Sequence, residues 1–209
     1  MMNKKTATEK PRKLTIESIV EGKQEAKFII GIDPDVERNG VAIVERASRK
    51  LEATSLPFAQ LIDYLRWCKE REQEGDNVFI VHIEAGWLNQ SNWHTRWGES
   101  VSQSAAKGRS QGRNEQVSRL IGEMCEHMDI PYRFIKPYAK CWQGRDRKIT
   151  HEELASFTGI MGQTNQEARD AALIAWLGAE LPIKVSMSQI IAANNGEKPG
   201  KQGKKKKIC

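Results

Sequence analysis

Four acidic side chains stand at the ends of predicted secondary-structure elements, where they are well placed to do chemistry. Asp33 and Glu84 each follow a short apolar run, whereas Glu167 and Asp170 are three residues apart in a helical pattern and share one helix face. Crowded carboxylates are unfavourable unless a cation joins them, and hard divalent metals prefer oxygen ligands. Two Mg²⁺ or Mn²⁺ ions about 4 Å apart would suit phosphodiester hydrolysis.

Two of these acids, Asp33 and Glu167, also have an ordinary role to weigh. Asp33 begins an Asp-Pro pair, which initiates turns, and Thr164-x-x-Glu167 has the spacing of a helix capping box. Asp170 follows the first turn of its helix and would be costly beside apolar neighbours without a partner. His82 is interpreted as a core or sheet-face histidine. The sequence holds no Ser/His/Asp or Cys/His arrangement of comparable strength and no phosphate-cradling G-x-x-x-x-G-K motif.

The patterns around the acids predict an α/β fold, a mixed sheet covered by helices. Apolar runs predict five strands, the first two joined as a hairpin by a polar turn through Asn39-Gly40. The strands are expected near 28–32, 41–44, 50–54, 78–83 and 132–135, and the helices near 57–75, 115–128, 150–159 and 164–181. The first and fourth strands are natural neighbours, which would bring Asp33 and Glu84 side by side.

Aromatic and basic residues gather in two further stretches. Residues 85–113 hold three of the six tryptophans among cations and are rich in Ser, Gly, Asn and Gln, so no core helix is predicted there. They suit base stacking and phosphate contacts, or else dock their tryptophans onto the body or a partner subunit. Residues 136–148 are a candidate phosphate-binding loop or a solvated loop. The candidate DNA-binding residues are Trp87, Trp93, Arg96, Trp97, Lys107, Arg109, Arg113, Lys136, Arg145 and Arg147.

Composition predicts one folded domain with charged ends. A chain of 209 residues is long enough to bury a proper core. Its net charge of +6 divides into +3 for residues 1–27, +5 for residues 194–209 and −2 for the body. Basic tails favour a polyanionic partner such as nucleic acid, or are solubilising or targeting appendages. We predict a mobile basic segment over 1–26, the folded domain over 27–192 and a disordered Lys-rich tail over 193–209.

The cysteines and the hydropathy indicate the compartment. Four scattered cysteines without a C-x-x-C pair are typical of free thiols in a reducing cytoplasm. No apolar run approaches the roughly 20 residues of a membrane span, so no membrane partner is expected. The first residues lack the apolar core of a secretory signal. The sequence therefore predicts a cytoplasmic protein.

Four motifs together resemble the RuvC-type Holliday junction resolvases. GIDPDVERNGVAIVE is similar to the first motif of that family, VFIVHIEAGW to the second, GRNEQVSRLIGEM to the long dimerisation helix, and EARDAALIAW to the closing D-x-x-D-A motif. The resemblance extends over roughly residues 28–181. It implies the ribonuclease H-like fold, a mixed five-stranded sheet flanked by helices, and makes the folded domain a RuvC-like nuclease domain.

The resemblance also implies roles for particular residues. Lys140 and Lys148 look like the basic positions of the family near the scissile phosphate, and Trp87 like the aromatic wedge that enters the junction. Three departures stand out: Asp35 where Gly is usual, Glu167 where Asp or His is usual, and a longer segment after Glu84. The longer segment leaves open which tryptophan meets DNA. The predicted catalytic residues are Asp33, Glu84, Glu167, Asp170, Lys140 and Lys148, and the four acids among them are the predicted metal ligands.

The motifs predict a metal-dependent, structure-selective endonuclease that cleaves four-way DNA junctions as a homodimer in recombination and repair. The cofactor would be Mg²⁺ or Mn²⁺, two ions per active site, and branch-migration machinery is a candidate partner. One alternative is a junction-binding protein with a degenerate nuclease site. Another is an actin-like or sugar-kinase-like ATPase, although those folds need a second domain and a second Gly-rich motif.

Overall fold

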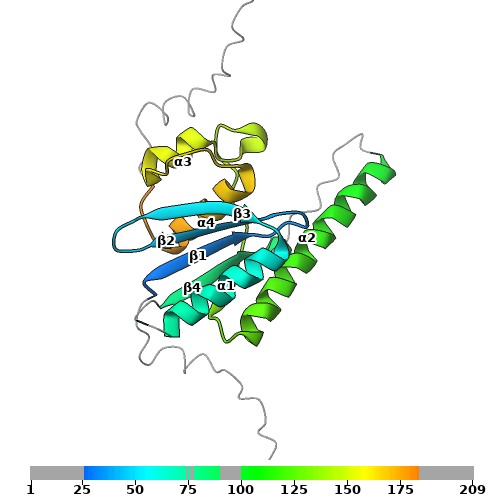
Figure 1. Cartoon of the computed structure of the whole chain (residues 1–209). Coiled ribbons are helices and arrows are strands. Elements are labelled where there is room, and N and C mark those ends of the chain that lie inside the picture. Colours follow the sequence, from blue (N-terminus) through cyan, green and yellow to red (C-terminus); the bar gives the residue numbers. More distant parts are fainter. Residues whose placement is uncertain (1–25, 74, 76–77, 90–99, 184–209) are drawn as a thin grey trace, which may run out of the picture.

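The computed structural model describes residues 26–73, 75, 78–89 and 100–183, which form a five-stranded sheet between two groups of helices (Figure 1). The sheet has the order β3-β2-β1-β4-β5; β1 is antiparallel to β2 and parallel to β4, and β4 is parallel to β5. This arrangement confirms the predicted ribonuclease H-like, mixed five-stranded fold. The strands are β1 (Phe28–Asp33), β2 (Asn39–Glu45), β3 (Leu51–Leu56), β4 (Phe79–Glu84) and β5 (Tyr132–Ile135).

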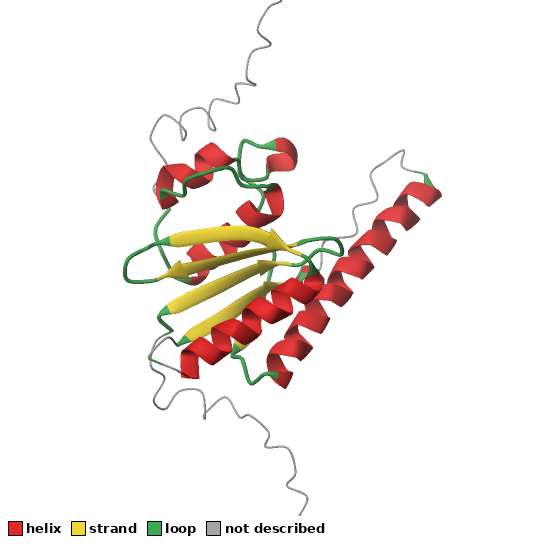
Figure 2. Ribbon diagram, viewed as in Figure 1, coloured by secondary structure: helices red, strands yellow, loops and turns green. Residues whose placement is uncertain are grey.

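Helices cover both faces of the sheet (Figure 2), and an apolar cluster is buried on each face. On one face α1 (Phe58–Gln73) and the C-terminal part of α2 (Val101–His127) pack against Ile30, Ile32 and Ile83. On the other face α3 (His151–Thr158) and α4 (Gln166–Gly178) pack against Ile29 and Val44. The side chains of a strand alternate between faces, so burying both faces requires the near-continuous apolar runs seen in β1 and β4.

The Asn39-Gly40 pair does not form the predicted hairpin turn. Both residues belong to β2, with Gly40 paired to Asp33, and the connection is the five-residue segment 34–38. Asn39 is fully buried and its side-chain amide donates a long 3.4 Å hydrogen bond to the carbonyl of Leu56. Gly40 is needed for close packing, because a Cβ there would overlap the carbonyl of Glu167 in α4.

The helix α2 begins fourteen residues earlier than predicted. Ser100 caps it by accepting from the backbone of Gln103, whose side chain in turn accepts from the backbone of Ser100. The polar composition of residues 101–113 argued against a core helix, and the first buried residue of α2 is indeed Ser118. The segment is a helix that projects beyond the sheet (Figure 1).

The remaining elements agree with prediction except at one cap. The Thr150/Glu153 capping box opens α3, and Gly159 ends it in the left-handed conformation. The cap of α4 is Asn165, whose side chain accepts from the backbone of Ala168, so Thr164 does not cap this helix. Cys68, Cys125 and Cys141, the three cysteines in the described part of the chain, are free thiols, as predicted. Among the described residues no helix has the length and apolar character of a membrane span.

A buried histidine makes the stability of the fold depend on pH. His82 in β4 has no exposed surface, and its Nε2 accepts from the Nε of Arg133 at 2.7 Å. Burial, together with the charges of Arg133 and Arg46, lowers the pKa of His82 to about 4. The unfolded chain therefore takes up this proton first, so the stabilisation is complete above about pH 6.5 and is lost as the pH falls to about 4.

We expect this histidine alone to lower the free energy of unfolding by about 3 kcal/mol between pH 7 and pH 4. Urea unfolding of the wild type and of His82→Leu across that range isolates the effect, because the carboxylates titrate in both proteins. The exposed Arg133 can rehydrate in the variant. Parallel pH profiles of the two proteins would contradict the prediction.

Candidate active site

The register of β1 and β4 brings two of the predicted acids together. The parallel pair is matched from Phe28 opposite Phe79 to Ile32 opposite Ile83, and Asp33 and Glu84 are the next residue of each strand. Strand alternation then directs both carboxylates to the sheet face covered by α4, since their apolar neighbours Ile32 and Ile83 belong to the core on the α1 side. The predicted proximity of Asp33 and Glu84 follows from the sheet itself.

Close packing of α4 adds Asp170 to this end of the sheet. A Cβ at Gly31 would overlap the carbonyl of Ala171 and would lie 2.5 Å from the backbone nitrogen of Ala175. Glycine at positions 31 and 40 therefore lets the helix backbone approach β1 and β2 directly. Asp33, Glu84 and Asp170 line one cavity of about 110 Å³ as a result.

Lys148 reaches the acids from the loop of residues 136–148, here called the basic loop. Its Nζ donates to Oδ2 of Asp170 at 2.6 Å, while Oδ1 of Asp170 accepts from Nε2 of Gln166 at 2.8 Å. Burial opposes the charge of Lys148, but this hydrogen bond and the surrounding acids raise the pKa of Lys148 above its ordinary value. Lys140 and Arg147 of the same loop also line the cavity.

Glu153 holds this basic loop in place. Both of its carboxylate oxygens accept from the backbone nitrogen of Gln143, at 3.0 and 3.2 Å, and one also accepts from the backbone of Thr150. Trp142 stacks on Phe157 of α3 with ring centroids 6.1 Å apart. The loop is thus fixed to α3.

The acids of the site disfavour one another's charged form. Burial is the largest cause that raises the pKa of Asp33 well above its ordinary value, followed by the charges of Glu84 and Asp170; Lys148 acts in the opposite sense. Burial and the charge of Asp170 likewise raise the pKa of Glu84. Groups perturbed in this way are stabilised as anions by an added cation.

Glu167 lies on the other side of Asp33 and Glu84. Together with Asp35 it lines a wider cavity of about 340 Å³, bounded by polar residues of α2. Asp33, Glu84 and Lys148 line both cavities, so they stand between Asp170 on one side and Glu167 on the other. The four predicted acids therefore border one continuous region.

The donor set fits a hard divalent cation in its chemistry, because carboxylate oxygens are the ligands that Mg²⁺ and Mn²⁺ prefer. Within the described residues, however, no three His, Cys, Asp or Glu side chains are arranged as a ready-made metal shell. Asp170 instead pairs with Lys148. Asp33, Glu84 and Asp170 are the side chains that would hold a metal, and the metal assignment stays a proposal.

The predicted DNA-binding residues are dispersed around this region. Trp87 packs on the body: the guanidinium of Arg119 lies 4.1 Å from the centre of its ring, and Phe134 meets it edge-on at 5.0 Å. Trp87 is therefore docked onto the body, which is the alternative to base stacking that the sequence left open. Its role as a wedge stays a prediction. Lys107, Arg109 and Arg113 are exposed on α2, and Lys136 and Arg145 are exposed on the basic loop. Trp93, Arg96 and Trp97 lie outside the described residues.

Sequence reasoning missed the polar residues that orient the acids. Gln166 precedes Asp170 by one helical turn, a spacing at which Gln and Asp side chains pair, so this contact had a local signal. Ser118 of α2 donates to the backbone carbonyl of Glu84 at 2.9 Å, and Asn114 donates to Asp35 at 3.2 Å. These long-range contacts had no local signal in the sequence.

Comparison with known proteins gives similarities among solved structures. No family model and no curated protein matches the sequence. Thermus thermophilus RuvC in complex with a Holliday junction substrate aligns at 12% identity and a TM-score of 0.41, over 71% of this chain and 90% of that chain. Another structure of Thermus thermophilus RuvC aligns at 14% identity and a TM-score of 0.38, over the same shares.

A viral protein gives a third similarity. The Fowlpox virus resolvase in complex with Holliday junction DNA aligns at 11% identity and a TM-score of 0.34, over 73% of this chain and 97% of that chain. The strand order and directions define the fold independently of these alignments.

Proposed function

We propose that this chain is a metal-dependent endonuclease that cleaves four-way DNA junctions. The observation that supports it most directly is the placement of Asp33 and Glu84 at adjacent ends of two parallel strands, with Asp170 and Lys148 around the same cavity. Such a group of half-buried acids needs a cation, and phosphodiester hydrolysis is chemistry that carboxylate-bound metals perform. The junction as substrate rests on the resemblance of the sequence motifs.

The residues of the site divide into metal ligands and charge-stabilising lysines in this proposal. Asp33, Glu84 and Asp170 would hold Mg²⁺ or Mn²⁺, which supplies an activated water and neutralises charge on the phosphate when bound. Lys140 and Lys148 would stabilise the charge that develops on the scissile phosphate. For this, Lys148 would give up its hydrogen bond to Asp170 and donate to a phosphate oxygen instead. Glu167 borders the site from the wider cavity and would assist these acids in holding the metal.

The DNA would extend from this site over basic residues of the loop and of α2. Contacts with phosphates supply most of the affinity of such surfaces and make it sensitive to salt. A homodimer formed through α2, which contains the segment similar to the family's dimerisation helix, would present two sites to a two-fold symmetric junction. Branch-migration machinery remains a candidate partner.

The test is incubation of the full chain with a synthetic four-way junction and Mg²⁺ or Mn²⁺, beside a linear duplex of the same sequence. We expect nicks in the junction that require metal, and little cutting of the duplex. EDTA serves as the control for metal dependence. Failure to cut the junction over a range of metal and salt concentrations would rule out the enzymatic function.

A second function is favoured by two observations. The ion pair between Lys148 and Asp170, at 2.6 Å, and the lack of a ready-made metal shell among the described residues suit a protein that binds junctions without cutting them. Junction binding in a gel-shift assay, with no cleavage under any metal, would support this non-enzymatic function instead.

A further inference from the structure

One turn of α2 contacts the ends of both strands that carry the predicted metal ligands. The hydroxyl of Ser118 donates to the backbone carbonyl of Glu84, at the end of β4. One turn earlier, Nδ2 of Asn114 donates to Oδ2 of Asp35, two residues beyond the end of β1. Asn114 and Ser118 are four residues apart and therefore share a helix face. These two contacts bridge the strand ends that bear Asp33 and Glu84.

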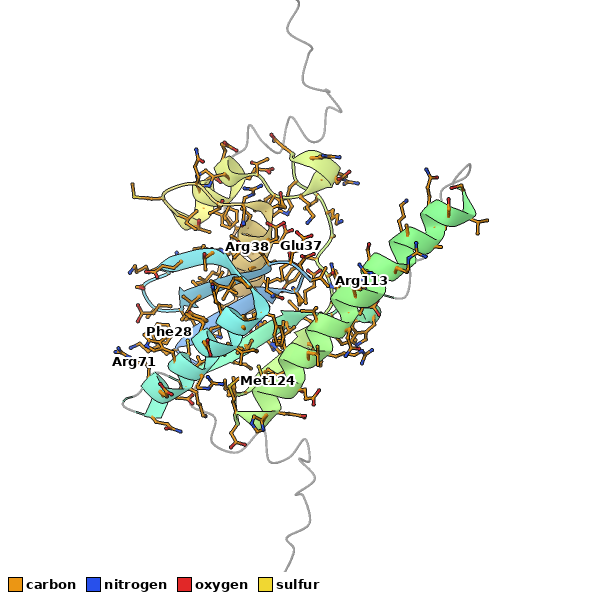
Figure 3. The ribbon with its side chains drawn as sticks, turned by 45° about the vertical axis from the view of Figure 1, so that its right-hand side comes forward. Phe28, Glu37, Arg38, Arg71, Arg113 and Met124 are labelled. Atoms are coloured by element: carbon orange, nitrogen blue, oxygen red, sulfur yellow. The ribbon has the colours of Figure 1, made fainter. Side chains whose placement is uncertain are left out.

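Both carboxylate oxygens of Asp35 and its backbone nitrogen make hydrogen bonds that fix the β1–β2 loop. Its Oδ1 accepts from the backbone nitrogen of Glu37 at 2.9 Å, closing the loop on itself, and its own backbone nitrogen donates to Oδ1 of the buried Asn39 at 3.2 Å. Its Oδ2 is the oxygen that accepts from Asn114. Figure 3 shows Glu37 and Arg38 on this loop at the end of the sheet that faces α2. The carboxylate thus joins the loop to the helix.

Residues 101–113 of α2, here called the arm, have little contact with the body. None of them is buried, and the arm contains Gly108 and Gly112. A Cβ at Gly112 would meet nothing within 4 Å. At 1.5 Å per residue the arm is about 20 Å long, and a helix of this length is marginal without packing. The position of the arm is therefore set by the part of α2 that packs on the body, whose first buried residue is Ser118, one turn after Asn114.

We propose that Asp35, Asn114 and Ser118 are positioning residues. The sheet brings Asp33 and Glu84 together, and the contacts of these residues with α2 set the final alignment of the two carboxylates, and with it metal binding. The inference rests on the proposed function, because it assigns the two acids to a metal. Mg²⁺ and Mn²⁺ need their ligands within narrow limits, so a small displacement of the loop next to Asp33 weakens metal binding. A partner or DNA that moves the arm would act on metal binding through the same contacts.

The test is Mn²⁺ binding without DNA, measured by electron paramagnetic resonance on the full chain. Residues that orient metal ligands change affinity about tenfold to a hundredfold, so we expect Asp35→Ala and Asn114→Ala each to weaken Mn²⁺ binding about tenfold. The double variant should be no weaker than Asp35→Ala alone, because Asn114→Ala removes only a contact that Asp35→Ala already removes. Gln116→Ala, an exposed position on α2, is the matched control and should bind as the wild type does.

Asp35→Asn separates position from charge. The asparagine keeps an acceptor for the backbone of Glu37, and its amide can pair with Asn114 once the Asn114 amide is turned round. Mn²⁺ affinity close to that of the wild type supports a positioning role, whereas a loss equal to that of Asp35→Ala makes Asp35 a source of charge and overturns the inference.

The remaining outcomes are also decisive. Wild-type affinity in Asp35→Ala and Asn114→Ala overturns the inference and leaves the proposed function standing. A wild type that binds no Mn²⁺ overturns the metal site and the inference together. Circular dichroism and urea unfolding of each variant show whether a weakened affinity reflects a lost fold.

Discussion

Replacing Asp33 by asparagine is expected to lower the rate of junction cleavage about a thousandfold, which corresponds to about 4 kcal/mol of transition-state stabilisation. The substitution keeps the size of the side chain but removes the negative charge of a proposed metal ligand that lines both cavities. Single-turnover cleavage with saturating protein measures the chemical step. Cleavage at the wild-type rate would exclude Asp33 from the active site.

The same substitution should not destabilise the fold. Burial and the charges of Glu84 and Asp170 raise the pKa of Asp33, so its ionised form is unfavourable in the metal-free protein. Removing that charge relieves the repulsion, and the free energy of unfolding should stay the same or rise. A loss of activity together with unchanged or increased stability separates a catalytic role from a structural one.

Glu167→Gln is the matched control among the acids. Glu167 borders the wider cavity with Asp33, but the smaller cavity is lined by Asp170 and by the cations of the basic loop. We therefore expect a clearly smaller loss of cleavage than for Asp33→Asn. A larger loss of cleavage in Glu167→Gln than in Asp33→Asn would indicate that the catalytic centre lies closer to α2.

The sheet and the pairing of its acids could be predicted because both follow from local patterns. Apolar runs identify β1 and β4 as buried strands, and the register makes Asp33 and Glu84 the next residues after Ile32 and Ile83. Parallel neighbours end at the same edge of a sheet, so one strand assignment places both carboxylates. Asp170 could be predicted as a site residue because an acid that follows the first turn of a helix and lies beside apolar neighbours needs a partner.

Other features could not be predicted, because tertiary contacts decide them. Asn39-Gly40 is a typical turn pair, yet the close approach of α4 requires glycine at position 40 within β2. Residues 101–113 have no apolar face, which usually excludes a helix; a capping box at their start and a buried C-terminal half make them one. Contacts such as Asn114 with Asp35 join residues 79 positions apart and leave no pattern in the sequence.

A methyl group at Gly40 is expected to destabilise the fold by about 3 kcal/mol and to lower cleavage as well. The added Cβ of Gly40→Ala would overlap the carbonyl oxygen of Glu167, lie 2.5 Å from its carbonyl carbon and 3.1 Å from the Cβ of Ala171. Most of these atoms belong to the backbone of α4, which cannot turn aside as a flexible side chain could. The helix must shift away from β2, and Asp170 moves with it.

Gly112→Ala supplies the opposite expectation for the same chemical change. In the exposed arm nothing lies within 4 Å of the added methyl group, and alanine favours a helix over glycine by about 1 kcal/mol, so this variant should be more stable than the wild type. Urea unfolding compares the two variants directly. If Gly40→Ala were as stable as the wild type, α4 would not approach β2 this closely, and the position of Asp170 beside Asp33 and Glu84 would lose its structural basis.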